Sequence, residues 1–337
     1  MGHSVDVAYI NDGPASPNLI GVGMHRLIGR NNYDPYLLWQ LIRVIQRIKP
    51  DIIHTWILQM DILGGIAAKL NRIPFILREP SSAMAYPLTW KTRLRIRIGS
   101  AASAIVSNSQ GGDEYWKPRL PKSRRFIVPN GMPIDDIDRV MGALPSGLKK
   151  TEAPIVLYAG RLSSDLSANK NLESFLKALA CIDQRKTVLG VLCGEGPQRH
   201  ELERLRDALQ LNEKVQFTGY LPISQVWALM KKASVFVSLS AYEGCPNTIM
   251  EAMVCGCPLI LSDIPAHREL VDDNCALFVK PSDIQQTADS IVRVLSDKNI
   301  TDVKALIAKQ KALKWSTIEM AGKYENVYKK LMPVPRM

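Results

Sequence analysis

The fold is decided by the stretch VFVSLSAYEGCPNTIME, residues 235–251. Its apolar first part, Val235–Leu239, predicts a buried strand, and Ser240–Gly244 predicts a turn. Asn247–Cys255 predicts a helix, and Pro246 is suited to the first helical position. A buried strand that is followed by a tight turn and a helix is one unit of a parallel α/β sheet.

The rest of the chain repeats this alternation. Strands of the second half are predicted at Ile155–Ala159, Val188–Cys193, Val215–Phe217, Pro258–Ser262 and Ala276–Val279. Helices there are predicted at Asn171–Ile182, Arg199–Leu209, Ser224–Lys232, Ile284–Leu295 and Trp315–Leu331. Strands of the first half are predicted at Val5–Ile10, Asp51–Trp56, Pro74–Leu77, Ala104–Asn108 and Phe126–Pro129. Its clearest helix is capped by Asp34 and carries an apolar face of Leu38, Leu41, Ile45 and Ile48.

A chain of 337 residues exceeds what one core usually serves, so we expect two domains. The Pro/Gly/Ser/Lys-rich stretch 144–151 predicts the linker between them. We therefore predict an α/β protein of two doubly wound, Rossmann-like domains, residues 1–147 and 148–315, that face a cleft. Ligands of such sheets bind beyond the carboxyl ends of the strands.

Charge is concentrated in the first half. Residues 1–150 hold 20 Lys and Arg against 11 Asp and Glu, which is +9 of the net +11 of the whole chain. This favours an anionic partner, although a solvated basic surface is an equal alternative. Nucleic acid is not expected, because no aromatic residues are interleaved with the cations. On the predicted helix around residue 94, Trp90 and Leu94 could dip into an anionic membrane surface. The accompanying cations, which would spread around the helix, are Lys91, Arg93, Arg95 and Arg97; a solvated helix flank is an equal alternative.

The six cysteines form no CxxC pair, so neither a zinc site nor a disulfide framework is predicted. The DxD-like triplet Asp136-Ile137-Asp138 is better explained as charges at a helix start than as a metal site. No run of about 18 apolar residues predicts a transmembrane helix. We expect a cytoplasmic protein, with peripheral attachment to the inner face of the membrane.

The start of the helix after Gly244 suits an anion. The backbone N–H groups of Asn247 and Thr248 would point out of the helix and could bind a diphosphate. Glu251, about one turn further, could accept from ribose hydroxyls, and Glu243 from the hydroxyls of a sugar. Taken alone, the two carboxylates are equally explained as charges that favour the helix dipole.

Cations and glycines follow the other strands of the second half. Gly160 and Arg161 end the first strand, and Lys170 begins the next helix, so both cations could neutralise phosphates. Two further strand ends carry flexible turns that allow close backbone approach. Their residues are Gly194, Glu195 and Gly219. Four successive strand ends with glycine, charge or both are more specific than any one of them.

These motifs resemble those of the retaining glycosyltransferases of family 4, whose architecture is called GT-B. The matching motifs of the second half are Gly160-Arg161-Leu162, Lys170-Asn171, Gly194-Glu195-Gly196-Pro197, Phe217-Thr218-Gly219 and the Glu243…Glu251 pair. The first half matches more weakly, through residues 50–55, 107–109 and 128–131. The helix with Trp315, Tyr324 and Tyr328 is similar to the family's closing segment, so residues 316–337 are expected to cross back onto the first domain.

The resemblance implies a role for each residue. Arg161 and Lys170 would bind the diphosphate and stabilise charge on the leaving phosphate. Glu243 would contact the donor sugar and Glu251 the ribose. The backbone of the stretch Gly244, Cys245, Pro246, Asn247 and Thr248 would hold sugar and phosphates. No metal or other cofactor is implied, and transfer would retain the anomeric configuration.

The sequence departs from the family pattern in two places. Members usually begin with a strand, a Gly-Gly loop and a helix before the segment that matches Gly2–Val7. The first domain is therefore expected to lack its first strand and helix. Where many members have a histidine, this chain has Arg78, which becomes a weak site candidate. His54 lies at a predicted strand end and is about twice as well explained as a structural histidine.

The function expected from the sequence is transfer of a hexose from a UDP- or GDP-sugar to a glycan or polyprenyl-linked acceptor, in the synthesis of cell-surface polysaccharide. One alternative is a catalytically impaired, nucleotide-binding remnant or assembly protein without the glycine loop. Another is a sugar-nucleotide epimerase of the same architecture, which would form its product without any acceptor.

Overall fold

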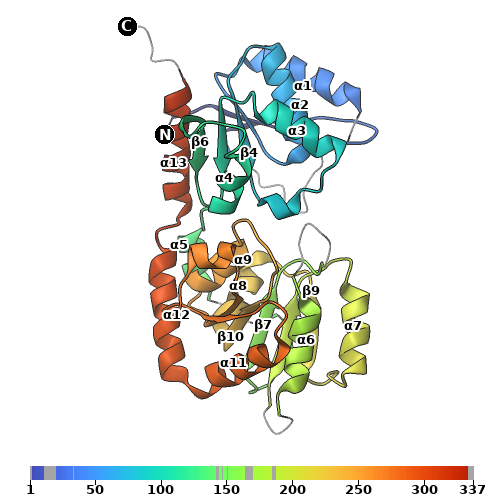
Figure 1. The fold of residues 1–337 in the computed structure, drawn as a ribbon, viewed down its shortest axis with the longest axis vertical. Coiled ribbons are helices and arrows are strands. Elements are labelled where there is room, and N and C mark those ends of the chain that lie inside the picture. Colours follow the sequence, from blue (N-terminus) through green and yellow to red (C-terminus); the bar gives the residue numbers. More distant parts are fainter. Residues whose placement is uncertain are drawn as a thin grey trace.

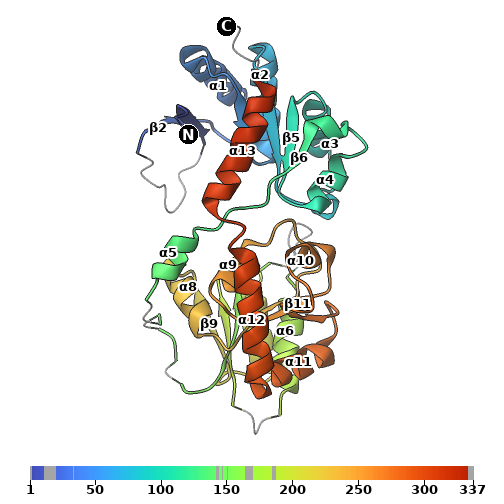
Figure 2. The same ribbon diagram turned by 90° about the vertical axis from the view of Figure 1, so that its left-hand side faces the viewer.

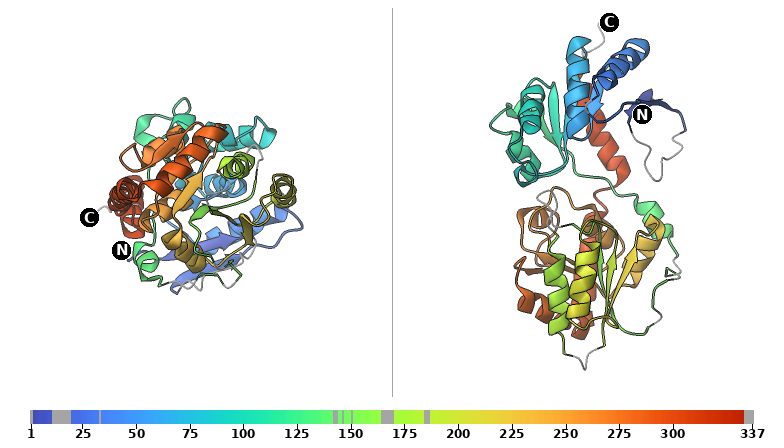
Figure 3. Two further views of the ribbon diagram at one scale, coloured as in Figure 1. Left: turned by 90° about the horizontal axis from the view of Figure 1, so that it is seen from below. Right: turned by 90° about the vertical axis from the view of Figure 1, so that its right-hand side faces the viewer.

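The computed structural model describes residues 2–10, 20–32, 34–141, 144–145, 147–149, 151–163, 170–183 and 187–332. These residues form two α/β domains that lie one above the other along the longest axis of the molecule (Figure 1, Figure 3). Both domains are built on parallel strands, as the alternation of apolar runs and helical patterns predicted.

The first domain contains a four-stranded parallel sheet in the order β3-β4-β5-β6. Its strands are β3 (Ile53–Thr55), β4 (Phe75–Glu79), β5 (Ala104–Ser107) and β6 (Arg125–Ile127). The helices are α1 (Pro35–Ile48), α2 (Leu58–Leu70), α3 (Trp90–Gly99) and α4 (Gln110–Trp116), with a 3₁₀ turn η1 (Ala83–Ala85). Strands β1 (Val5–Tyr9) and β2 (Val22–Arg26) pair with each other in a separate parallel sheet.

The second domain contains a six-stranded parallel sheet in the order β12-β11-β10-β7-β8-β9. Its strands are β7 (Ile155–Ala159), β8 (Leu189–Cys193), β9 (Val215–Gly219), β10 (Val235–Ser238), β11 (Leu259–Ser262) and β12 (Leu277–Val279). The chain begins the sheet in the middle, builds outward through β9, and then returns to the other side of β7. This is the doubly wound order, and its reversal point between β7 and β10 is where ligands bind in such sheets.

Helices cover both faces of this sheet. The helices of one face are α8 (Ile223–Lys232), α9 (Asn247–Val254) and α12 (Lys298–Ala312), which contribute to one buried apolar cluster. Those of the other face are α6 (Leu172–Cys181), α7 (Arg199–Ala208) and α11 (Ile284–Ser296). The short helix α10 (Pro265–Leu270) follows β11 at the carboxyl edge of the sheet.

The last helix, α13 (Thr317–Leu331), leaves the second domain and packs on the first (Figure 2). Its Tyr324 and Val327 are buried against Ile76 of β4 and Val106 of β5. The expected return of the closing helix is therefore present.

The polypeptide crosses between the two domains twice, at two segments that lie next to each other. Met132 and the buried Ile137 of α5 (Ile134–Arg139) already pack in the core of the second domain, so the first passage lies before the predicted linker 144–151. The second passage is at Ser316, which pairs with Met132 in a parallel bridge. There the Met132 N–H donates to the Trp315 carbonyl (2.7 Å), and the Thr317 N–H donates to the Met132 carbonyl (3.1 Å).

The predicted strands and helices are all present, with limits that agree to within two residues. No range was predicted for strand β2 or for helices α2, α4, α10 and α12. On α1, Asp34 caps the helix as expected, but Leu37 rather than Leu38 is among its buried residues.

The prediction that residues of α3 meet an anionic membrane is wrong for Leu94 and Arg95, which pack inside the domain. Arg95 is only 1% exposed: its Nε donates to Asp61 (2.7 Å) and its Nη1 to Glu79 (2.7 Å), both of which are fully buried. Leu94 packs on the apolar cluster between α2, α3 and β4. A buried charge requires such partners, because desolvation is otherwise too costly. Trp90, by contrast, is 65% exposed.

The DxD-like triplet lies in helix α5, where Asp136 pairs with Arg139 and Asp138 with Lys309. This agrees with the interpretation as helix charges. Within the described ranges, no helix is both long enough and apolar enough to cross a membrane.

Candidate functional site

The strand ends of the second domain are joined by backbone contacts that need glycine. The Gly160 N–H donates to the Cys193 carbonyl (2.9 Å), and the Gly194 N–H donates to the Gly219 carbonyl (3.0 Å). Gly194 has φ +139°, and a Cβ there would lie 1.9 Å from the carbonyl oxygen of Gly160. The turns after β7, β8 and β9 are therefore joined by backbone hydrogen bonds, and the close approach at Gly194 leaves no room for a side chain.

Lys170 and Glu243 meet at the reversal point of the sheet. Lys170 lies just before α6 and Glu243 follows β10, and the ammonium group donates to Glu243 Oε1. Both side chains keep about one sixth of their surface exposed (17% and 16%). Ser240 Oγ donates to the same carboxylate oxygen (2.7 Å). The two residues that the sequence assigned to phosphate and sugar are thus in direct contact.

Residues next to Lys170 and Glu243 form further hydrogen bonds at this edge of the sheet. Asn171 adopts a left-handed conformation (φ 50°) at the start of α6, and its amide donates to the Leu239 carbonyl (2.9 Å). Arg161 follows β7 at the same edge, and its side chain is exposed. Its carbonyl accepts from the buried Tyr158 hydroxyl (2.9 Å). Arg161, Lys170 and Glu243 therefore all lie at the carboxyl ends of β7 and β10.

Helix α9 begins where the sequence predicted an anion-binding helix start. Pro246 is the N-cap rather than the first helical residue, so that detail of the prediction is wrong. The Ile249 and Met250 N–H groups bond to the Pro246 carbonyl. Asn247 and Thr248 form the first turn, where no preceding helical carbonyl is available to their N–H groups. Cys245, the residue before Pro246, carries a half-buried thiol. Burial raises the pKa of this thiol to about 11, so it stays protonated.

Glu251 lies one turn into α9 and is largely buried. Burial raises the pKa of its carboxyl group to about 7, and the nearby Trp227 indole opposes part of this rise. The Trp227 N–H is itself buried and has no well-aligned acceptor among the described residues. A carboxyl group in such surroundings gains from ligand hydroxyl groups that replace its lost hydration.

The first domain closes over this edge. Gly244 is buried so tightly that a Cβ would lie 2.4 Å from the Pro80 carbonyl oxygen, in the loop after β4. Asn130 Nδ2 donates to Asn247 Oδ1 at the start of α9 (2.6 Å). At the far side, the Glu269 carboxylate of α10 accepts from the Gln110 N–H of α4 (2.8 and 3.0 Å). The candidate site therefore lies between the domains.

Arg78 and His54 lie on the first-domain side of this interface. Arg78 donates to Asn130 Oδ1 through Nη2 and to the Tyr324 hydroxyl through Nε (3.3 Å), and it stacks over Trp56 at 4.2 Å. It is thus one residue removed from Asn247. His54 Nδ1 contacts the Tyr328 hydroxyl (3.0 Å), and burial lowers the pKa of His54 to about 3. His54 is a neutral group within an aromatic cluster.

Sequence reasoning missed three polar residues of the site. Ser240 bonds to Glu243, Asn130 bonds to Asn247, and Glu269 joins the two domains. Asn130 belongs to the Pro-Asn-Gly turn that the resemblance had marked, so it carried a local signal. Glu195, which the sequence did place near the site, pairs with Arg199 of α7 (3.2 Å).

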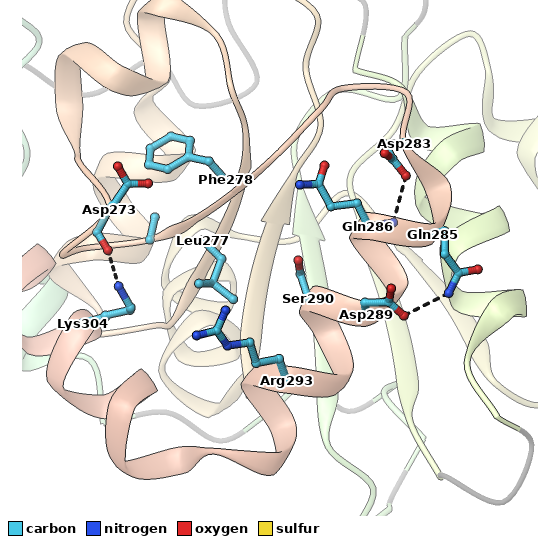
Figure 4. Close-up of a pocket in the computed structure, with 11 residues that line it drawn as sticks. Asp273, Leu277, Phe278, Asp283, Gln285, Gln286, Asp289, Ser290, Arg293 and Lys304 are labelled. Carbon is cyan, nitrogen blue, oxygen red and sulfur yellow. Dashed lines mark hydrogen bonds between the residues drawn. The ribbon is translucent and has the colours of Figure 1, made fainter.

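A separate cavity of about 670 Å³ lies between β12, α11 and α12 (Figure 4). It is lined by polar side chains such as Gln286, Asp289 and Arg293, with Phe278 at one end. Its lining contains none of the candidate site residues. We therefore place the functional site at the interdomain edge and not in this cavity.

Two Rossmann-like domains with a polar site between them define the class: the chain has the GT-B fold of glycosyltransferases. Residues 144–312 match the family model described as glycosyl transferases group 1, and residues 1–136 match that of Glycosyltransferase Family 4. The chain belongs to the glycosyl transferases group 1.

The curated relatives share only about a quarter of their residues with this chain. The alpha-D-kanosaminyltransferase of Streptomyces kanamyceticus is 26% identical over 71% of this chain and 63% of its own length. The GDP-mannose:cellobiosyl-diphosphopolyprenol alpha-mannosyltransferase of Xanthomonas campestris is 27% identical over 80% of this chain and 65% of its own length. The chain thus spans under two thirds of both relatives.

A solved structure supports the fold. The Anabaena protein HepE in complex with UDP and glucose superposes with a TM-score of 0.80 at 19% identity, over 96% of this chain and 91% of that one.

Proposed function

We propose that this protein is a glycosyltransferase that transfers a hexose from a UDP- or GDP-sugar to a glycan or lipid-linked acceptor. The observation that carries the proposal is the contact between Lys170 and Glu243, beside Arg161 and the start of α9, at the reversal point of the second sheet. Relatives named for GDP-mannose and a polyprenyl acceptor, and a similar fold in complex with UDP and glucose, support it.

Donor binding follows from the charges at this edge. The diphosphate lies at the start of α9, where helix N–H groups favour an anion, and Arg161 and Lys170 neutralise it. An ammonium group has three donors, so Lys170 can keep Glu243 while it bonds to a phosphate oxygen. Glu243 then accepts from a sugar hydroxyl, and Glu251 accepts from the ribose.

Transfer proceeds with retention of configuration and without a metal ion. The acceptor hydroxyl attacks the anomeric carbon on the face that the diphosphate leaves. The bond between this carbon and the phosphate oxygen breaks, and the acceptor proton passes to the departing phosphate. Arg161 and Lys170 stabilise the negative charge that grows there, which is electrostatic catalysis by groups already in place.

Titration with UDP, GDP and their hexose derivatives tests donor binding. Each of Arg161→Ala and Lys170→Ala removes a charge-assisted hydrogen bond, which corresponds to an affinity loss of about 10- to 100-fold. Lys177→Ala is the matched control, because Lys177 is an exposed cation of α6 that pairs with Glu173 of the same helix. If the wild-type chain binds no nucleotide sugar, the proposed function is wrong. If the variants bind like wild type, the site assignment is wrong.

Incubation with polyprenyl-diphosphate glycans tests transfer, and the anomeric configuration of the product is read by NMR. Activity should persist in a chelator. Release of product from the donor in the absence of acceptor would instead indicate an epimerase, and donor binding without any turnover would indicate a binding protein.

A lipid-linked acceptor would place the first domain near an anionic membrane. Leu88 and Trp90 are 83% and 65% exposed beside Lys91 and Arg93, a mixture that suits the lipid interface. Sedimentation with vesicles that contain phosphatidylglycerol tests this surface. The variant Leu88→Ser/Trp90→Ser should stay in the supernatant, and equal pelleting of both proteins would contradict membrane contact here.

A further inference from the structure

Three buried polar residues lie behind Glu243. Ser240 follows β10, Ser262 ends β11, and His267 belongs to α10, and none is more than 1% exposed. The residues that precede Ser240 and Ser262 in the chain, Leu239 and Leu261, are apolar and also buried. Polar side chains in such a position are costly unless each is hydrogen-bonded, so their bonds indicate what they do.

The three residues form a continuous chain of hydrogen bonds. His267 Nδ1 lies 2.8 Å from the Ser262 carbonyl and 3.2 Å from its hydroxyl. The Ser262 hydroxyl donates to the Ser240 carbonyl (2.6 Å). The Ser240 hydroxyl then donates to Glu243 Oε1 (2.7 Å), the oxygen that also accepts from Lys170.

This arrangement defines the state of His267. A carbonyl only accepts, so Nδ1 carries the proton and Nε2 is left with a lone pair. Burial lowers the pKa of His267 to about 4, which keeps the ring neutral at physiological pH. Nε2 is buried and has no partner among the described residues. Among the described residues, His267 therefore takes part in this series of hydrogen bonds through Nδ1 alone.

The chain restricts how Glu243 can turn. The hydrogen bonds that its carboxylate accepts from described residues both use Oε1, so Oε2 keeps its capacity to accept from a ligand. Without the Ser240 hydroxyl, Lys170 is the partner that remains for this carboxylate among the described residues, and in the proposed complex Lys170 also binds the diphosphate. With Ser240 present, the serine hydroxyl orients Glu243 and Lys170 can bind phosphate.

We propose that Ser240, Ser262 and His267 are positioning residues that hold the Glu243 carboxylate ready for the donor sugar. This deepens the proposed function and rests on it. Glu243 is the residue that contacts the sugar; the other three act through it. Loss of the chain should therefore weaken recognition of the hexose, while the nucleotide and its phosphates bind as before.

The test compares two ligands on one set of variants: a nucleotide sugar and the corresponding nucleoside diphosphate. For Ser240→Ala we expect the affinity for the nucleotide sugar and the kcat to fall about 10-fold, with less than a twofold change for the nucleoside diphosphate. Ser240→Thr keeps the hydroxyl and should restore both. Ser238→Ala, at a buried serine two residues earlier at the end of β10, is the matched control.

His267 provides an independent arm. His267→Asn places an amide N–H close to the position of Nδ1 and should bind the sugar like wild type, whereas His267→Leu should behave like Ser240→Ala. This comparison keeps the proposal testable if the alanine variant of Ser240 does not fold.

The outcomes separate the two proposals. Equal loss for both ligands, together with a lower melting temperature, assigns the chain a purely structural role and overturns the inference. Unchanged discrimination in Ser240→Ala and His267→Leu also overturns it, while the proposed function stands. If wild type binds neither ligand, both proposals fail.

Discussion

We expect the proposed donor binding to depend on pH, because burial raises the pKa of the Glu251 carboxyl group. This carboxyl group titrates at about 7, because burial disfavours the charged form. A carboxylate that accepts from both ribose hydroxyls must be ionised, so the proposed complex favours the deprotonated state. Donor binding should therefore release a proton at acidic pH, and affinity should increase as pH rises through 7.

The magnitude follows from linkage. If only the ionised form binds, the fraction of competent protein is about one tenth at pH 6 and about nine tenths at pH 8, so Kd should decrease about 10-fold over this range. The ligand should be a nucleotide sugar, because the terminal phosphate of a nucleoside diphosphate itself titrates near pH 6. His267 and His54, with pKa values of about 4 and 3, stay neutral throughout.

Isothermal titration calorimetry in two buffers of different ionisation enthalpy measures both the affinity and the proton release. Glu251→Gln keeps the shape of the side chain without the charge and should show a flat profile. A wild-type profile that is flat between pH 6 and 8, or a Glu251→Gln profile with the same slope as wild type, would refute the role of Glu251.

Three further predictions concern the frame around the site. Arg95→Leu leaves two buried carboxylates without their cation and should lower the free energy of unfolding by about 3–5 kcal/mol, measured by urea denaturation. Gly194→Ala cannot coexist with the Gly160 carbonyl and should destabilise the second domain, seen as a lower melting temperature; an unchanged value would contradict the turn geometry. Glu269→Ala should speed hydrogen exchange at the Gln110 amide without changing global stability.

Local patterns were sufficient for the fold. Apolar runs such as Ile155–Ala159 and caps such as Asp34 act within a few residues, so strand and helix limits were predictable from the sequence. The burial of Arg95 was not predictable from the sequence, because its carboxylate partners lie 34 and 16 residues away along the chain. Only the packing of the domain brings these partners next to α3. An arginine between apolar residues gives the same local pattern whether its partners are carboxylates or water.

For the candidate site, the sequence predicted the residues at strand ends but not the contacts between distant segments. Glycines and charges at strand ends signalled Gly194, Lys170 and Glu243, because parallel strands present their carboxyl ends on one side. Ser240 and Ser262 carried no signal: their bond depends on β10 and β11 being neighbours in the sheet. The bond between Asn130 and Asn247 spans 117 residues and two domains, so it could be found only in the assembled structure.

The docking of α13 has a consequence for synthesis of the protein on the ribosome. Residues 317–331 follow the whole second domain, yet Tyr324 and Val327 complete the core of the first. Until they emerge, one face of the sheet that contains β4 and β5 stays uncovered. The domain translated first is therefore completed last, because its core needs a helix that is translated after the whole second domain.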